Sequence, residues 1–141
     1  MLIEPLPTKG DVLRACRGVE HTAHPLLRAA YELACLHERS PSDEHQGTDI
    51  NCRRAGLVRE IDRWVYAHLP PAHGCASVHT ETLGTVIDRL AEYTAIAYTA
   101  LASPSDNDLG DAWERLAELA VGYEDLADEV TTGRRRLPGG P

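Results

Sequence analysis

The sequence lacks phenylalanine altogether, and aromatic residues make up only 5% of its 141 residues. A hydrophobic core must therefore be built from Leu, Ala, Val and Ile, and chains rich in Ala and Leu favour helix. Hydrophobic residues make up 43% and charged residues 26% of the chain, a composition typical of a globular protein. At this length a single domain can bury a core without disulfides or metals.

Long apolar runs and paired cysteines are also missing. No run approaches the ~20 apolar residues of a membrane span, and no signal peptide is recognisable. The four cysteines include no Cys-x-x-Cys pair, which argues against a zinc knuckle or a thioredoxin-type motif. We therefore expect reduced thiols in a soluble cytoplasmic protein that does not associate with membranes.

Positive charge is scarce, since the formal net charge is −8. This balance argues against a nucleic-acid partner, because contact with phosphates needs a basic surface. The run Arg134-Arg135-Arg136 is local, and at the end of a last helix it suits the negative end of the helix dipole.

Motifs that carry known chemistry are absent as well. The chain has no Gly-x-Ser-x-Gly elbow, no phosphate-binding glycine loop and no dinucleotide fingerprint. No glutamate stands three residues before a histidine, as the di-iron bundles require. We predict neither a cofactor nor a metal, and whether the protein is an enzyme stays open.

What the sequence does contain is helical periodicity in four long segments, with no alternation typical of strands. The predicted helices span residues 9–17, 25–39, 49–69, 80–102 (starting at Thr80 or Thr82) and about 106–133, with a loop over 40–47 and a turn over 103–106. Short connections between amphipathic helices predict an all-α fold, an antiparallel four-helix bundle with a short additional N-terminal helix. The predicted organisation is an extended lead-in over 1–8, a single domain over 9–136 and a flexible tail over 137–141.

Two polar residues interrupt the apolar stripes of these helices. Arg54 lies near the centre of one stripe, where a cation needs a partner such as Glu38, Glu124 or Asp125. A structural ion pair, or an Arg reaching the edge of the bundle, is favoured over a ligand-binding role. His37 lies on another stripe, where a hydrogen-bonded core histidine is the commoner outcome.

Glu81 and Asp88 stand one heptad apart, so they share a helix face about 10 Å apart along the axis. That separation is too large for both carboxylates to bind one metal ion. They point away from the apolar stripe of their own helix, which predicts either a solvated face or a face that meets another subunit or a substrate. Gly84 lies between them and would allow another backbone to approach closely.

Three short segments resemble a bacterial family known as domain of unknown function 4254. The first is Thr-Glu-Thr-Leu-Gly at residues 80–84, followed by Ile-Asp-Arg-Leu at 87–90, with Leu83 where the family has proline. The second is Ile-Asn-x-x-Arg at 50–54, where the family's Arg-Asn-Asp has become Arg-Ala-Gly. The third is Leu36-His37, although the Trp-rich acidic segment that follows in the family is replaced here by a loop.

The resemblance covers roughly residues 25–136 and implies a helical bundle in a short, actinobacterial form of the family, with no established activity. It adds weight to the polar positions that match. The candidate ligand-binding residues are His37, Asn51, Arg54, Glu81, Asp88 and Arg89.

Two functions remain in competition. The first is a protein-interaction or self-associating accessory module, which would form a homo-oligomer or bind a partner protein. The alternative is a small-molecule binding protein or an enzyme with a polar site between helices, around Arg54, His37, Glu81 and Asp88. In that site Arg54 would hold an anionic group, and His37 or a carboxylate would move a proton. The alternative requires these side chains to converge on one cavity, within one subunit or across a dimer interface.

Overall fold

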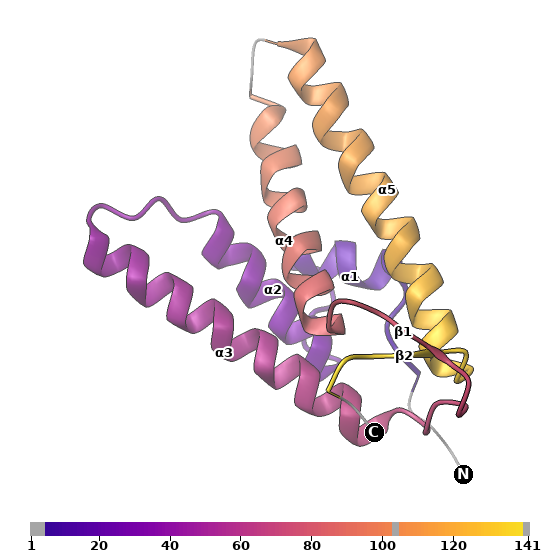
Figure 1. Cartoon of the computed structure of the whole chain (residues 1–141). Coiled ribbons are helices and arrows are strands. Elements are labelled where there is room, and N and C mark those ends of the chain that lie inside the picture. Colours follow the sequence, from indigo (N-terminus) through magenta and orange to yellow (C-terminus); the bar gives the residue numbers. More distant parts are fainter. Residues whose placement is uncertain (1–4, 103–104, 140–141) are drawn as a thin grey trace.

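The computed structural model of the chain describes residues 5–102 and 105–139, and most of them are helical (Figure 1). The helices are α1 (Lys9–Cys16), α2 (Pro25–His37), α3 (Glu44–His68), α4 (Leu83–Ala100) and α5 (Asp106–Thr131). The predicted all-α class is therefore confirmed. Within the described ranges, no helix is long and apolar enough to span a lipid bilayer.

The helix starts follow local capping chemistry. Helix α2 begins at Pro25, and the Thr82 hydroxyl accepts a hydrogen bond from the amide of Thr85 at 3.2 Å to cap α4, as the sequence predicts. The predicted loop over 40–47 is wrong in its second half. The Asp43 carboxylate accepts from the amide of Gln46 at 2.8 Å, so α3 begins at Glu44, before the Asp49 cap that we expected.

The helices form two hairpins, α2 with α3 and α4 with α5, which diverge from a common base (Figure 1). Helix α4 is central and packs against α1, α2, α3 and α5. Helices α3 and α5 make no contact in the described part of the chain, so the regular antiparallel four-helix arrangement is not confirmed. The short helix α1 contacts α2, α4 and α5, and its Val12 and Ala15 are fully buried. It belongs to the core.

A two-residue parallel strand pair, β1 (Ser77–Val78) with β2 (Arg135–Arg136), joins the α3–α4 connection to the chain end. The sequence predicts no strand, because two residues are too few to show alternation. Leu137, in the predicted flexible tail, is buried, and the Tyr66 hydroxyl donates to the carbonyl of Pro138. Residues 1–4, 103–104 and 140–141, parts of the predicted lead-in, turn and tail, lie outside the described residues.

Candidate functional site

Three helices converge on one carboxylate, that of Asp88 in α4. The imidazole Nε2 of His37, the last residue of α2, lies 2.8 Å from Asp88 Oδ1. Arg54 of α3 donates from Nη2 to Asp88 Oδ2 at 2.9 Å and from Nε to Oδ1 at 3.4 Å. Arg54 also donates from Nη1 to the side-chain carbonyl of Asn51 at 3.2 Å. We call His37, Asn51, Arg54 and Asp88 the Asp88 cluster.

Three side chains of the Asp88 cluster are wholly or partly shielded from water, whereas Asn51 is exposed. The exposed fractions of the His37, Asp88 and Arg54 side chains are 9%, 15% and 32%. Burial alone would raise the pKa of Asp88, but hydrogen bonds from His37 and Arg54, together with the positive charge of Arg54, outweigh it. The pKa of Asp88 therefore lies below its ordinary value of 3.8, and the carboxyl is ionised at neutral pH.

An ionised Asp88 determines the protonation of its partners. A carboxylate can only accept, so Nε2 of His37 carries the proton that it donates. The hydrogen bond from Arg54 to Asp88 raises the pKa of the guanidinium further, so this group stays charged. Both oxygens of Asp88 and all three nitrogens of the Arg54 guanidinium are then engaged. The Asp88 carboxylate is thus held by side chains of two other helices, which is typical of a structural tie.

We expect the stability that Asp88 provides to depend on pH. Because its pKa is lower in the folded than in the unfolded chain, its contribution is present above its ordinary value of 3.8 and is lost as pH falls through the lowered pKa. Urea unfolding of the wild type and of Asp88→Asn measures this contribution. The difference in unfolding free energy should be constant near neutral pH and should shrink below about pH 4. If the difference in unfolding free energy instead grew as the pH fell, the pKa of Asp88 would be raised by folding and not lowered.

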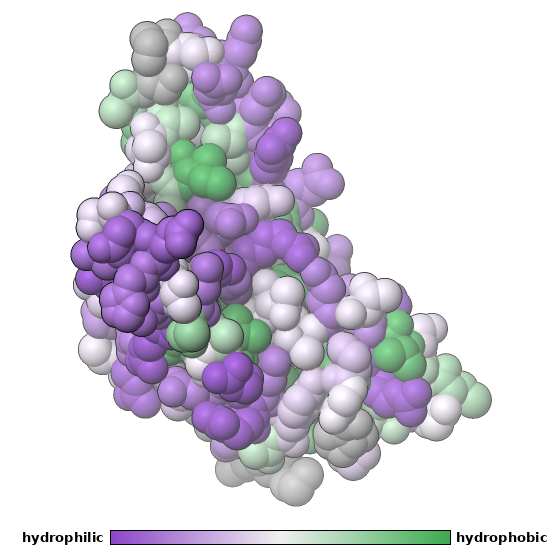
Figure 2. Space-filling model, turned by 60° about the vertical axis from the view of Figure 1, so that its left-hand side comes forward, coloured by the Kyte–Doolittle hydropathy of each residue, from purple (hydrophilic) through white to green (hydrophobic). Residues whose placement is uncertain are grey.

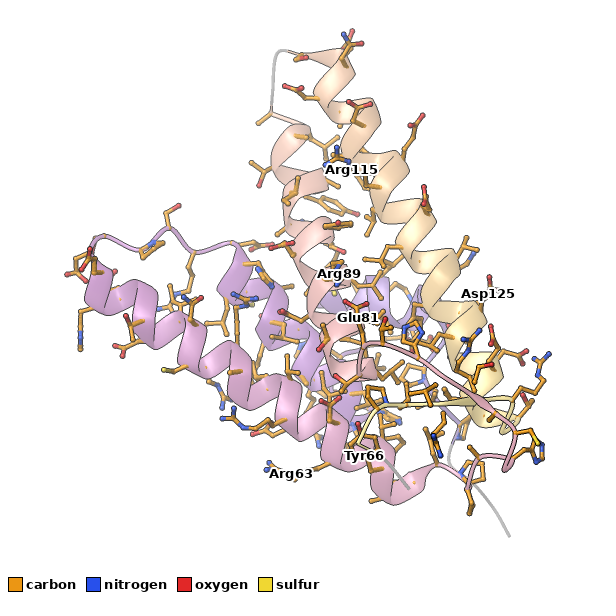
Figure 3. All side chains as sticks on the ribbon, in the orientation of Figure 1. Arg63, Tyr66, Glu81, Arg89, Arg115 and Asp125 are labelled. Carbon is orange, nitrogen blue, oxygen red and sulfur yellow. The ribbon has the colours of Figure 1, made fainter. Side chains whose placement is uncertain are left out.

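Glu81 and Arg89 lie close together and form a separate ion pair (Figure 3). Arg89 donates to both carboxylate oxygens of Glu81, and each side chain is about one-third exposed. The hydrogen bond to Glu81 raises the pKa of Arg89. The structure thus brings together four of the six predicted site residues, and these two lie apart from them.

Asp62 of α3 makes a further polar contact with α4, and the sequence analysis did not single this residue out. Its Oδ1 accepts from the amide of Gly84 at 2.8 Å, in the first turn of α4. Burial raises the pKa of Asp62 above its ordinary value of 3.8, although hydrogen bonds from Gly84 and Thr82 act in the opposite direction. The four-residue spacing of Val58 and Asp62, which places both on one helix face, is the signal that could have indicated this contact.

Two predictions about these residues are wrong. The partner of Arg54 is Asp88, whereas Glu38 pairs with Arg17 at 3.3 Å. Asp125, another expected partner, points away from α4 on the far side of α5 (Figure 3). The sequence predicts that Asp88 faces solvent, another subunit or a substrate, whereas its side chain is 15% exposed and pairs with His37 and Arg54. It is covered because α4 has neighbours on several sides, so its buried surface is wider than one apolar stripe.

Several cavities lie on the described part of the molecule, and one of them adjoins the segments that carry the Asp88 cluster. A cavity of about 390 Å³ lies between the end of α2 and the start of α3, and others of about 300 and 230 Å³ lie near α1 and between α4 and α5. None of these three is lined by His37, Arg54 or Asp88. Among the described residues, no group of three or more His, Cys, Asp and Glu side chains is placed to hold a metal ion.

The fold and the cluster together define an all-α protein in which an ionic tie links its two hairpins. The chain belongs to the family described as "Protein of unknown function (DUF4254)", whose sequence model matches residues 45–138. The resemblance seen in the short motifs is thereby confirmed. His37 precedes the matched range, and the other five predicted site residues lie inside it. No curated protein and no solved structure matches the chain.

Proposed function

We propose that this protein is a protein-interaction module that docks a partner through the projecting end of the α4–α5 hairpin. We call residues 93–102 and 105–115 the α4–α5 arm. The arm extends beyond the α2–α3 hairpin (Figure 1). A helical hairpin that projects from the core offers two helix faces to a partner.

The observation that carries the proposal is the apolar surface of this arm. Ile96 and Leu101 expose 51% and 58% of their surface. Figure 2 shows hydrophobic residues on the upper, projecting part of the molecule, bordered by hydrophilic ones. Between the two helices lies a groove of about 230 Å³, lined in part by Tyr93, Ile96 and Ala112. Apolar residues that gather at a groove rimmed by polar ones mark sites of protein contact more often than scattered exposed residues do.

The alternative function, a small-molecule site around Arg54, has weaker support. The carboxylate of Asp88 is already paired with His37 and Arg54, and Glu81 is paired with Arg89. A ligand would have to displace these bonds. The cavity of about 390 Å³ between α2 and α3 includes Leu36, Ile50 and Arg53, neighbours of cluster residues in the sequence, but none of the side chains that bind Asp88. A helix-to-helix tie explains the cluster without a ligand.

A photo-cross-linking amino acid at position 96 tests the interaction function in the source cells. Val121 of α5 provides the matched control, because it exposes 49% of its surface and does not line the groove. We expect covalent adducts of defined mass from position 96 and none from position 121. Equal adducts from both positions, or none from either, would contradict the proposal.

Light scattering of the purified protein separates the two kinds of partner. An adduct of twice the chain mass together with a dimer in solution would mean self-association, and a monomer with an adduct of another mass would mean a different protein.

A bacterial, cytoplasmic setting remains part of this proposal, on the basis of the resemblance and the cysteine pattern.

A further inference from the structure

Charge is distributed unevenly over the molecule, and almost all of its excess lies on α5. This helix contains nine acidic residues and one basic residue, Arg115, so its formal charge equals the −8 of the whole chain. Within the described residues, only Asp128 and Glu129 of the nine form ion pairs, with Arg134 and Arg135. The remaining carboxylates have no cationic partner there.

Some of these unpaired carboxylates border the apolar groove of the α4–α5 arm. Asp108 and Asp111 line the groove together with Arg115, which points toward α4 (Figure 3). Glu118 follows one turn after Arg115 and is exposed. The groove therefore has an apolar floor, formed by Tyr93, Ile96 and Ala112, and a rim that is acidic overall.

The rim argues against a second copy as the occupant. Two arms packed face to face would bring two strongly acidic α5 helices close together. At physiological salt, charges repel one another over a screening length of about 8 Å, which is comparable to the spacing of packed helices. Like charges at an interface oppose association, whereas an oppositely charged partner is attracted and oriented. The occupant must therefore bring positive charge.

The shape of the site favours a helix. A trough between two antiparallel helices accepts a third helix, whose apolar residues at i, i+3, i+4 and i+7 enter the trough while its polar face meets the rim. The groove-lining residues of α5 extend from Asp108 to Arg115, and these seven residue steps span about 10 Å, or roughly two turns of a docked helix. An apolar stripe flanked by Lys or Arg matches this length and charge.

We propose that the α4–α5 groove binds a cationic amphipathic helix of a partner protein. The inference rests on the proposed function and adds the chemistry of the partner. Asp108 and Asp111 select the positive charge, and Ile96 with Tyr93 provides the apolar contact.

Two synthetic helical peptides with the same leucine face, one with a Lys and Arg polar face and one with a Glu polar face, test this on the full chain. Fluorescence anisotropy should show binding of the cationic peptide, weakened by salt, and no binding of the acidic one. The double variant Asp108→Asn/Asp111→Asn should bind the cationic peptide about tenfold more weakly. Equal binding of both peptides would overturn the inference.

A matched pair of variants separates the groove from general attraction to an acidic protein. Ile96→Asp and Val121→Asp add the same charge at similarly exposed positions, so circular dichroism should report an intact fold for both. We expect Ile96→Asp to abolish binding of the cationic peptide and Val121→Asp to leave it unchanged. Equal effects of the two variants would contradict a site at the groove.

Failure of this inference and failure of the proposed function give different results. A dimer in solution that Ile96→Asp dissociates, with no binding of the cationic peptide, would identify a second copy as the occupant and leave the interaction function standing. If the cationic peptide does not bind, no dimer forms and position 96 gives no adduct, both the inference and the proposed function are contradicted.

Discussion

Replacing Asp88 by alanine should lower the free energy of unfolding by about 3 kcal/mol. The variant removes the single carboxylate that joins α2, α3 and α4 and leaves Arg54 and His37 shielded without their acceptor. A charge left without its partner in a buried site costs more than the lost bonds themselves. Asp88→Asn should cost less, because its amide oxygen can still accept one of the hydrogen bonds.

Urea unfolding followed by circular dichroism measures this loss, since urea, unlike guanidinium, does not screen charges. Glu81→Ala is the matched control, because it also removes a carboxylate that accepts from an arginine, at a more exposed place. That exposed pair should contribute less than about 1 kcal/mol. If both variants cost the same, the Asp88 cluster is not the tie that we describe. If Asp88→Ala leaves stability unchanged, the ligand-binding alternative regains support.

Local features of the fold could be predicted from the sequence, because they depend on neighbouring residues. Pro25 and Thr82 mark helix starts by their own backbone and hydroxyl chemistry. The start of α3 was missed because Asp49 and Asp43 are both good caps, and the bond of Asp43 to the amide of Gln46 decided between them. The angle between the hairpins was not predictable, since helical periodicity says which face is apolar and not which helix covers it.

The candidate site shows the same division. The types of residue at the cluster could be predicted, because a cation and a histidine on apolar stripes need partners. Their pairing could not, because it depends on the register in which α3 crosses α4. In that register Arg54 meets Asp88 and, one turn along each helix, Val58 meets Gly84. Two of the three segments that resemble the family, at residues 50–54 and 80–90, thus lie on the two sides of one helix crossing.

Gly84→Ala should destabilise the protein by about 3 kcal/mol, although alanine is normally the better helix residue. A Cβ atom at position 84 would lie 2.6 Å from the carbonyl oxygen of Val58 and 2.6 Å from Oδ1 of Asp62. The Asp62 carboxylate can rotate away, but the Val58 carbonyl belongs to the backbone of α3, so the two helices must separate. Gly122→Ala is the control, because nothing lies within 4 Å of its added Cβ. It should stabilise the protein by roughly 0.5–1 kcal/mol, and urea unfolding of both variants should therefore give opposite signs.

The separation that Gly84→Ala forces should also weaken the bond between Arg54 and Asp88, because Gly84 and Asp88 lie one turn apart on the same crossing. The double variant Gly84→Ala/Asp88→Ala should then lose less free energy of unfolding than the sum of the two single losses. A shortfall of about 1 kcal/mol or more would be typical of residues in one contact network. Additive losses would mean that α3 shifts locally where it contacts Gly84 of α4, while its contact through Arg54 stays in place. The crossing would then be a flexible contact, and the Asp88 cluster would act independently of it.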